Sequence, residues 1–383
     1  MTAATAYQCE QVFDGNRLHR DTSLVVKDGL VQGLVPNAQL EADVDRIDLG
    51  GGILAPGLID LQVNGGGGLM LGDAESVEDI ARICHAHLSL GTTALTPTLI
   101  TDTPETTRKV VKLGIEAWAR GVRGFQGLHL EGPHLFKGRK GAHDPDLIRS
   151  MTDEDMELYL YAAGHLPSLI VTIAPETVTP DQIRRLAGAG VHVSLGHSGA
   201  SYAECKTASE AGASCVTHLF NAMSPLQHRE PGLVGAALDL GALSAGLIAD
   251  GVHVDPVAMK IALKAKEGPG RIFLVTDAMS QTGTDVTSFH LGGREIFRRN
   301  GTLTLADGTL AGADIDLPSS LAYLTGNVDV PVETALAMAT RDPAEVIGRP
   351  LGQLVEGRSA DLVHFVDDFS VAGVWVKGHP LSA

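Results

Sequence analysis

The feature of this sequence that most limits its fold is a series of short apolar runs that alternate with longer helix-patterned stretches. Helical spacing of apolar residues is seen, for example, in residues 76–90 and 104–120. The apolar runs are residues 58–61, 92–95, 125–130, 169–174, 191–195, 215–217, 244–249 and 272–276. This alternation predicts repeated βα units with a parallel sheet, and eight of them favour a TIM-like (β/α)8 barrel of the α/β class.

Both ends of the chain differ from this alternating middle because they are rich in β-type residues. Residues 23–34 form two such runs around Asp28-Gly29, a pair that favours a tight hairpin turn, and residues 359–378 have the same character. Residues 289–312 also interrupt the alternation with hairpin-like runs. We therefore expect a β-hairpin insertion within the barrel sequence.

The charge balance excludes several classes of partner. The 383 residues include 29 Lys and Arg against 46 Asp and Glu, which gives a formal net charge of −17. Such a chain repels nucleic acids and anionic membrane surfaces, so we predict neither as a partner. An anionic ligand therefore needs a local group of basic residues.

Cysteine spacing and hydropathy indicate the compartment. The four cysteines form no C-x-x-C pair and no dense framework, so we expect free thiols in a reducing environment. No stretch has the pattern of a signal peptide or the length of an apolar transmembrane helix. We therefore expect a cytoplasmic protein. The sequence also lacks the G-x-x-x-x-G-K-[ST] loop that cradles nucleotide phosphates.

Four of the predicted strands end in a polar residue suited to catalysis. Glu131, His197, His218 and Asp277 each stand at or just beyond the end of an apolar run. The carboxyl ends of the strands of a (β/α)8 barrel converge on one mouth, so these four side chains can meet despite their separation in sequence. Two imidazoles and one carboxylate suit a divalent metal with open positions for water and substrate. The separate Asp277 can then act as a proton shuttle.

Each of these residues alone has a simpler structural interpretation. A lone histidine at a strand end is commonly a hydrogen-bonded core or loop residue. Glu131 can accept backbone hydrogen bonds in the Gly132-Pro133 turn, and Asp277 can cap the following segment. The coincidence of four strand ends favours the metal site. The His85-x-His87 pair is predicted to lie on a helix, where residues two apart point in different directions, so we assign it to the surface or to packing.

Gln62 and Asn64 continue the first predicted barrel strand. Residues two apart on a strand share one face, so both amides should look into the barrel mouth. Neutral amides are poorer ligands for borderline metals than imidazole or carboxylate. We therefore expect them to hydrogen-bond water or substrate rather than to hold a metal.

The order of these motifs resembles that of a known family. The opening Ala55-Pro56-Gly57-Leu58-Ile59-Asp60 segment, the strand-end histidines and the late aspartate look like the amidohydrolase superfamily. Within it, the chain resembles the N-acetylglucosamine-6-phosphate deacetylase family over nearly its whole length. The matching motifs are Gln62-x-Asn64-Gly65, Leu130-Glu131-Gly132-Pro133, Lys140-Gly141-Ala142-His143, Gly196-His197-Ser198, Thr217-His218-Leu219-Phe220-Asn221-Ala222-Met223, Asp250-Gly251-x-His253 and Thr276-Asp277-Ala278.

That resemblance implies a (β/α)8 barrel joined to a small β-sandwich domain built from both termini. The corresponding boundaries are residues 1–54 and 350–383 for the sandwich and residues 55–349 for the metal-dependent hydrolase barrel, with the insertion near residues 289–312. The resemblance also implies hydrolysis of the acetamido group of N-acetylglucosamine 6-phosphate to glucosamine 6-phosphate and acetate, a step of amino-sugar catabolism.

The resemblance assigns roles to residues of this sequence. It implies that Glu131, His197 and His218 bind one divalent metal ion per subunit, with zinc as the first candidate and iron, manganese or cobalt as alternatives. Asp277 becomes the catalytic acid and base, and His143 polarises the acetyl carbonyl. The implied substrate contacts are Gln62, Asn64, Ala142, His143, Asn221, Ala222, Arg229, Gly251, His253, Leu310, Ala311 and Gly312.

The same resemblance implies how an acidic protein holds a phosphorylated sugar. Arg229 and His253 are implied to bind the phosphate of the neighbouring subunit's substrate through charge-assisted hydrogen bonds, which predicts a homodimer. Gln62-x-Asn64 stands where related amidohydrolases have His-x-His, so a second metal ion is not expected. We assign no role to His134, which follows the Glu131 motif.

Other interpretations of the same residues stay open. Two histidines and one carboxylate also form the facial triad of non-haem Fe(II) oxygenases, although those enzymes generally use all-β scaffolds. An amidohydrolase-like scaffold that has lost its metal is a non-enzymatic alternative, since fold alone does not prove activity. A sibling amidohydrolase could act on another N-acyl sugar or on a cyclic amide.

Overall fold

Eight parallel strands form the centre of the protein. The computed structural model describes residues 4–291, 293–299, 301–308 and 310–381. Within them, the eight strands lie side by side in the order of the sequence. They are β8 (Leu58–Val63), β11 (Thr92–Ile100), β12 (Leu128–Glu131), β13 (Leu169–Ile173), β14 (His192–Leu195), β15 (Cys215–Val216), β16 (Ser244–Leu247) and β17 (Ile272–Leu274).

The first and last of these strands meet and close the sheet into a barrel. The segment that follows β17 pairs with β8 through a parallel bridge between Val63 and Ala278. The backbone amide of Asp277 donates to the carbonyl of Gln62 at 2.9 Å, and that of Asn64 donates to the carbonyl of Ala278 at 2.8 Å. The prediction of a (β/α)8 barrel is confirmed.

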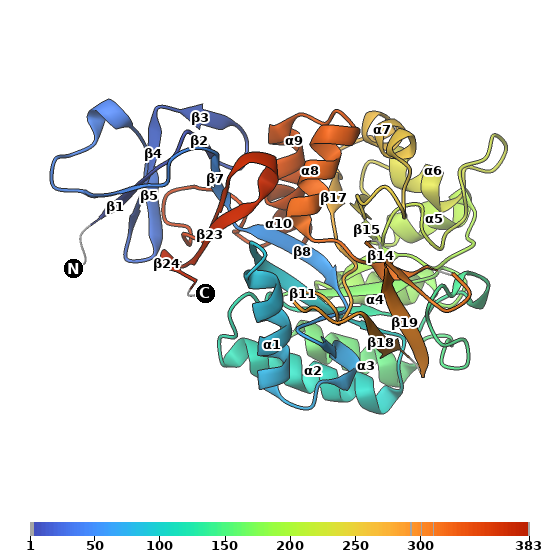
Figure 1. Cartoon of the computed structure of the whole chain (residues 1–383). Helices are drawn as coiled ribbons and strands as arrows, with labels where there is room; N and C mark the ends of the chain where they lie inside the picture. The colour runs from blue at the N-terminus through green and yellow to red at the C-terminus, as the bar shows by residue number, and fades with distance from the viewer. Residues whose placement is uncertain (1–3, 292, 300, 309, 382–383) are drawn as a thin grey trace.

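Helices cover the outside of the barrel (Figure 1). Four of them begin with a capping box, in which a Ser or Thr and the residue three positions later satisfy each other's backbone amides. The predicted helices at residues 76–90 and 104–120 correspond to α1 and α2. The helices are α1 (Val77–Leu88), α2 (Pro104–Ala119), α3 (Asp153–Ala163), α4 (Pro180–Gly188), α5 (Tyr202–Glu210), α6 (Gly232–Asp239), α7 (Pro256–Ala265), α8 (Leu317–Asn327), α9 (Val332–Ala339) and α10 (Arg341–Val346).

The two ends of the chain together form a small β-sandwich beside the barrel, where the blue and red strands lie together in Figure 1. One sheet has the order β5-β4-β1-β6 and the other β24-β23-β22-β7-β2-β3. Leu24, Leu54, Leu362 and Trp375 pack in the core between them. The strands are β1 (Thr5–Gln8), β2 (Gln11–Phe13), β3 (Leu18–Arg20), β4 (Thr22–Lys27), β5 (Leu30–Pro36), β6 (Asp45–Asp48), β7 (Ile53–Pro56), β22 (Leu362–Phe365), β23 (Val371–Val376) and β24 (His379–Pro380).

The sandwich was expected from the family resemblance, and the hairpin around Asp28-Gly29, which joins the antiparallel strands β4 and β5, was expected from the residues themselves. Strand β7 pairs with β22 from the C-terminal end and lies across the predicted boundary at residue 54. The exact limits of the two domains stay a prediction. All four cysteines are buried and free.

An antiparallel sheet occupies the place of the predicted hairpin insertion. It contains β18 (Ser288–Leu291), β19 (Arg294–Arg299), β20 (Thr302–Thr304) and β21 (Leu310–Ala313). Its apolar residues pack with Met70, Ala142 and Met279, which lie at the barrel mouth. Met70 belongs to a short ribbon of β9 (Gly65–Gly66) and β10 (Leu69–Met70). Across the described segments of the chain, none of the helices has the length and apolar character needed to cross a bilayer.

Candidate metal and catalytic site

The four predicted strand-end residues meet at the barrel mouth, as the topology requires. Glu131, His197, His218 and Asp277 line one cavity of about 220 Å³. Most of the predicted substrate contacts line the same cavity. These are Asn64, Ala142, His143, Asn221, Ala222, His253, Leu310, Ala311 and Gly312.

Three ligand-type atoms form a compact triangle inside this cavity. Oε1 of Glu131 lies 3.1 Å from Nε2 of His197 and 3.1 Å from Nε2 of His218, and the two nitrogens are 3.0 Å apart. Ligands at about 2.0–2.1 Å from a tetrahedral ion are separated by roughly 3.3 Å. The triangle therefore has nearly the size that a divalent ion requires.

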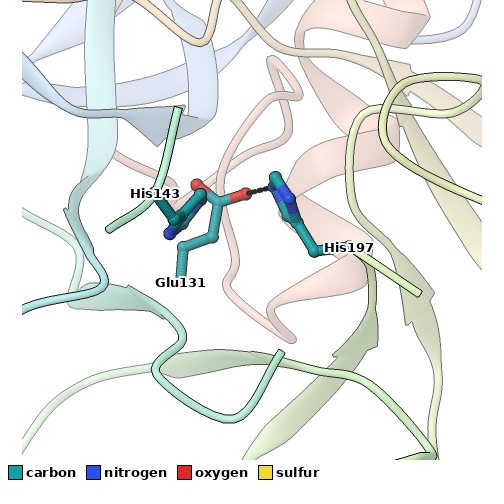
Figure 2. A group of neighbouring side chains, drawn as sticks. All are labelled: Glu131, His143 and His197. Carbon is teal, nitrogen blue, oxygen red and sulfur yellow. Dashed lines mark hydrogen bonds and ion pairs between the residues drawn. The ribbon is translucent and has the colours of Figure 1, made fainter. Parts of the chain in front are cut away.

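The hydrogen bond on the far side of His197 decides what that ring presents to the cavity. Its Nδ1 lies 2.9 Å from the carbonyl oxygen of Arg139, which can only accept. The neutral ring therefore carries its proton on Nδ1 and directs the lone pair of Nε2 at the carboxylate of Glu131 (Figure 2). Two acceptors that face each other in a buried site need a proton or a metal cation between them, and this donor set fits a metal ion.

The charges around Glu131 agree with this arrangement. Burial raises the pKa of Glu131, but the influence of the adjoining His197 and His218 rings outweighs it and holds that pKa well below its ordinary value. The Glu131 carboxylate is thus ionised and available as a ligand. Nδ1 of His218 is buried and has no hydrogen-bond partner among the residues that the structure describes.

His143 also approaches Glu131 and His197, and the ligand-type atoms of these three buried residues lie within 4.8 Å of one another (Figure 2). The ring of His143 carries its hydrogen on the other nitrogen than the ring of His197 does. The backbone amide of Thr101 donates to Nδ1 of His143 at 3.2 Å, so the neutral ring has its N–H at Nε2. Burial lowers the pKa of His143 to about 3, which keeps the ring neutral. It can therefore donate a hydrogen bond into the cavity.

Asp277 is held by the two amides that the sequence placed on the first strand. Nδ2 of Asn64 donates to Oδ1 of Asp277 at 2.7 Å, and Nε2 of Gln62 donates to the same oxygen at 3.2 Å. The Gln62 nitrogen also lies 3.3 Å from both carboxylate oxygens of Glu131. Burial and the nearby Glu131 carboxylate raise the pKa of Asp277. Asp277 can thus take up a proton at a higher pH than an exposed aspartate.

The backbone at the strand ends is strained. His197, His218 and Asp277 have φ angles of 46°, 29° and 53°, in the left-handed region that residues other than glycine seldom adopt. Such strain costs of order 1–3 kcal/mol per residue and is concentrated at functional sites. These conformations turn the backbone as it leaves each strand. Apolar patterning in a sequence cannot reveal such turns.

Three predicted contacts, Gln62, Arg229 and Gly251, lie outside the cavity lining. Arg229 is exposed on the loop before α6 and has no hydrogen-bond or ion-pair partner in the described part of the chain. Gly251 has a φ of 72°, and a Cβ atom there would lie 2.1 Å from the hydroxyl of Tyr323. Its neighbour His253 does line the cavity and is paired with Asp250 at 2.6 Å.

Three residues that sequence reasoning missed support the site. Thr101 sets the proton position of His143, and the Arg139 carbonyl sets that of His197. Asp60 accepts from the hydroxyl of Thr276 at 2.5 Å beneath Asp277. Thr101 directly follows β11, but the sequence pattern placed the end of that strand at residue 95. His87 donates to the carbonyl of Gly65 at 2.9 Å, which confirms its assignment to packing.

Comparisons with known proteins agree with this geometry. Residues 53–381 match the amidohydrolase family. The chain is 41% identical over 374 residues to the N-acetylgalactosamine-6-phosphate deacetylase of Shewanella sp. strain ANA-3, covering 97% of this chain and 94% of that protein. It is 36% identical to the N-acetylglucosamine-6-phosphate deacetylase of Haemophilus influenzae, covering 94% of each.

Solved structures give the same result. The crystal structure of N-acetylglucosamine-6-phosphate deacetylase from Pasteurella multocida superimposes with a TM-score of 0.94 at 33% identity, covering 99% of this chain and 100% of that one. A Mycobacterium smegmatis deacetylase in complex with N-acetyl-D-glucosamine-6-phosphate has a TM-score of 0.90 at 31% identity, with 99% of both chains covered. This chain therefore belongs to the amidohydrolase family and, within it, to the deacetylases of N-acetylhexosamine 6-phosphates.

Proposed function

We propose that this protein hydrolyses the acetamido group of N-acetylglucosamine 6-phosphate to glucosamine 6-phosphate and acetate. The observation that carries the proposal is the buried triangle of Glu131, His197 and His218 with Asp277 beside it in one cavity. An amide resists hydrolysis because water is a weak nucleophile and an amine is a poor leaving group. The residues of this cavity address both difficulties.

Glu131, His197 and His218 would hold one divalent ion, and zinc suits their mixed nitrogen and oxygen donors. When bound, such an ion activates water and polarises a carbonyl group. The proton positions favour His218 over His143 as the third ligand, since Nε2 of His143 carries a hydrogen. The N–H groups of Gln62 and Asn64 are engaged by carboxylates, which supports a single ion per subunit.

Asp277 is the proposed acid and base. As a carboxylate it accepts a proton from the attacking water, and as an acid it then passes this proton to the departing amine nitrogen, a role that typically contributes about 10² to 10⁴ in rate. Asn64 and Gln62 fix the carboxyl group in place. The Nε2 hydrogen of His143 donates to the acetyl oxygen and stabilises the negative charge that develops there.

We propose a homodimer in which Arg229 binds the phosphate of the neighbouring subunit's substrate. His253 was predicted to do the same, but it lines the cavity of its own chain, which favours a contact with that chain's own substrate. Arg229 is exposed and points to no acidic partner in the described part of the chain. On helix α7, Val257 and Ile261 are 64% and 57% exposed and stand one helical turn apart. Exposed apolar residues of this kind support a contact between subunits.

N-acetylgalactosamine 6-phosphate is a second candidate substrate, because the relative from Shewanella, at 41% identity, is named for it. The two sugars differ only in the orientation of the hydroxyl group at C4. A site that hydrogen-bonds that hydroxyl can separate the epimers strongly, whereas an apolar or solvent-filled site cannot.

The experiment that tests the proposal measures acetate release from both phosphorylated epimers and from plain N-acetylglucosamine. We expect the highest kcat/KM with N-acetylglucosamine 6-phosphate and a large loss without the phosphate. A higher kcat/KM with the galactosamine epimer would favour the second candidate. Absence of acetate from all three would refute the deacetylase proposal for this chain.

A further inference from the structure

We infer that His134 is a positioning residue that fastens the loop of residues 133–149, and that this loop positions His143 and the backbone carbonyl that accepts from His197. The inference rests on the proposed function, since it concerns how His143 and His197 are held for that reaction. His134 contacts neither of them. It acts through the two ends of the loop.

His134 is fully buried, at 0% exposure, and both ring nitrogens are engaged. Nδ1 lies 3.2 Å from the carbonyl oxygen of Arg149, and Nε2 lies 3.1 Å from the hydroxyl of Tyr159. A carbonyl only accepts, so Nδ1 of the neutral ring donates to Arg149 and Nε2 accepts from Tyr159. The ring thus joins the start of the loop to its end and to helix α3.

Further contacts join the same two ends. The backbone amide of Arg149 donates to the carbonyl of Pro133 at 3.1 Å. The guanidinium of Arg149 forms a two-pronged ion pair with Asp155 on α3, one contact of which measures 2.6 Å. The amide of Ala174 donates to the carbonyl of His134 at 2.8 Å, which ties the loop to the end of β13. The base of the loop is therefore closed and anchored.

The fastened loop supplies three elements of the site. It carries His143, whose ring enters the cavity, and the carbonyl of Arg139, which accepts from Nδ1 of His197. The backbone amide of Phe136 also donates to the carbonyl of His197 at 3.0 Å. Opening the base of the loop would release all three contacts at once. Misplacement of a reacting group by about 1 Å can cost roughly 100-fold in rate.

Substitutions of His134 can separate fastening from mere filling of space. In His134→Asn the side-chain amide stands where Nδ1 stood and can still donate to the Arg149 carbonyl. In His134→Gln the amide stands nearer to Tyr159 and leaves that carbonyl without its donor. In His134→Phe the volume is kept and both hydrogen bonds are lost. If His134 only fills space, the longer Gln should preserve activity better than Asn. If His134 fastens the loop through the Arg149 carbonyl, Asn should preserve activity better than Gln.

The experiment compares these variants with His364→Phe as a matched control. His364 is also buried and also bonds a backbone carbonyl, that of Gly51 at 2.9 Å, but it lies on β22 in the sandwich. The metal-loaded proteins are assayed for kcat and KM, for bound metal, and for amide hydrogen exchange at residues 136–149.

Fastening predicts that His134→Phe and His134→Gln lower kcat by roughly 10- to 100-fold with a smaller change in KM, and that exchange at residues 136–149 accelerates by a similar factor. His134→Asn should recover most of both, and His364→Phe should change neither. Unchanged exchange and kcat in His134→Phe would overturn the inference, as would a Gln variant that outperforms Asn. If His134→Phe does not fold, the Asn and Gln pair decides.

These readouts separate the inference from the proposed function. If the wild type releases no acetate from any N-acetylhexosamine 6-phosphate, the proposed function fails, and the exchange and metal-content comparisons still test the fastening of the loop. If the wild type is active and the exchange pattern does not follow the Asn and Gln order, only the inference about His134 fails.

Discussion

At the scale of single residues, the chemistry of this site depends on which nitrogen of each histidine carries the proton. His197 faces a backbone carbonyl and therefore presents a lone pair to the cavity, whereas His143 faces a backbone amide and therefore presents an N–H. Two residues of the same type thus acquire opposite roles, one as a metal ligand and one as a hydrogen-bond donor. Their backbone partners are distant in sequence, so the sequence alone could not separate the two roles.

Replacing a proposed ligand should remove the metal. Loss of a residue that only hydrogen-bonds a metal ligand typically lowers metal affinity by roughly 10- to 100-fold. We expect His197→Ala or His218→Ala, which remove a ligand itself, to lower the affinity for the ion by more than this. Elemental analysis after dialysis measures this. His85→Ala, at an exposed histidine on α1, is the control and should keep its metal. Either ligand variant with full metal content and full activity would show that the ligands are misassigned.

Removing the proton shuttle should leave the metal in place. Asp277→Asn preserves the shape of the side chain but cannot accept or return a proton, so kcat should fall by at least about 100-fold while bound metal and fold are retained. Steady-state kinetics together with metal analysis check this. A kcat near that of the wild type would move the acid and base role to another group.

At the scale of elements, the sequence located all eight barrel strands but not their lengths. The second strand was expected at residues 92–95, and strand β11 in fact continues through Pro97 to Ile100. The register shifts between Leu95 and Pro97, and the hydroxyl of Thr98 accepts from the backbone amide of Val63 at 2.9 Å. Apolar patterning cannot predict this register shift or this hydrogen bond. The end of the strand, and with it Thr101, was therefore missed.

Closure of the barrel between β8 and the segment after β17 involves an aspartate that should titrate in an unusual range. Asp60 is fully buried and accepts from the amide and hydroxyl of Thr276. Burial outweighs these bonds and raises the pKa of Asp60 to about 7. Between about pH 4 and pH 7 the folded state then binds more protons than the unfolded state, so this carboxyl makes the protein less stable as pH rises through that window.

Asp60→Asn should remove this dependence. As pH rises from 4.5 to 8, the free energy of unfolding of the variant should increase relative to that of the wild type by roughly 2–4 kcal/mol, at 1.36 kcal/mol per pKa unit, so the variant gains in relative stability. Urea unfolding of both proteins across this range measures the difference. Parallel pH profiles for the two proteins would contradict the raised pKa.

At the scale of the whole molecule, the β-rich ends and the alternating middle were enough to predict a barrel and β structure at both ends. Periodicity could not give the way in which β22 and β23 join the N-terminal strands, because that pairing spans the entire chain. The converging strand ends were predictable from topology alone. The loop of residues 133–149 was not, since its fastening depends on side-chain contacts with α3.

Assembly of the proposed dimer can be tested with mixed subunits. A double variant with Arg229→Ala and Asp277→Asn, mixed with wild type, should form hybrids in which the one active site lacks its phosphate contact. Losing a charged hydrogen bond of about 1.5–3 kcal/mol should raise KM by roughly 10- to 150-fold at that site. Hybrids made with Asp277→Asn alone are the control and should keep a normal KM. A normal KM in both hybrids would show that Arg229 does not serve its neighbour.

The central claim is that this chain uses one divalent ion and Asp277 to remove the acetyl group of an N-acetylhexosamine 6-phosphate. The most direct measurement is the simultaneous yield of acetate and free amine from N-acetylglucosamine 6-phosphate and its C4 epimer, with metal-loaded wild type, chelated wild type and metal-loaded Asp277→Asn. We predict equal amounts of acetate and amine from at least one epimer with the loaded wild type, and at least about 100-fold less from the other two proteins. Undiminished product from the chelated protein or from Asp277→Asn would contradict the account.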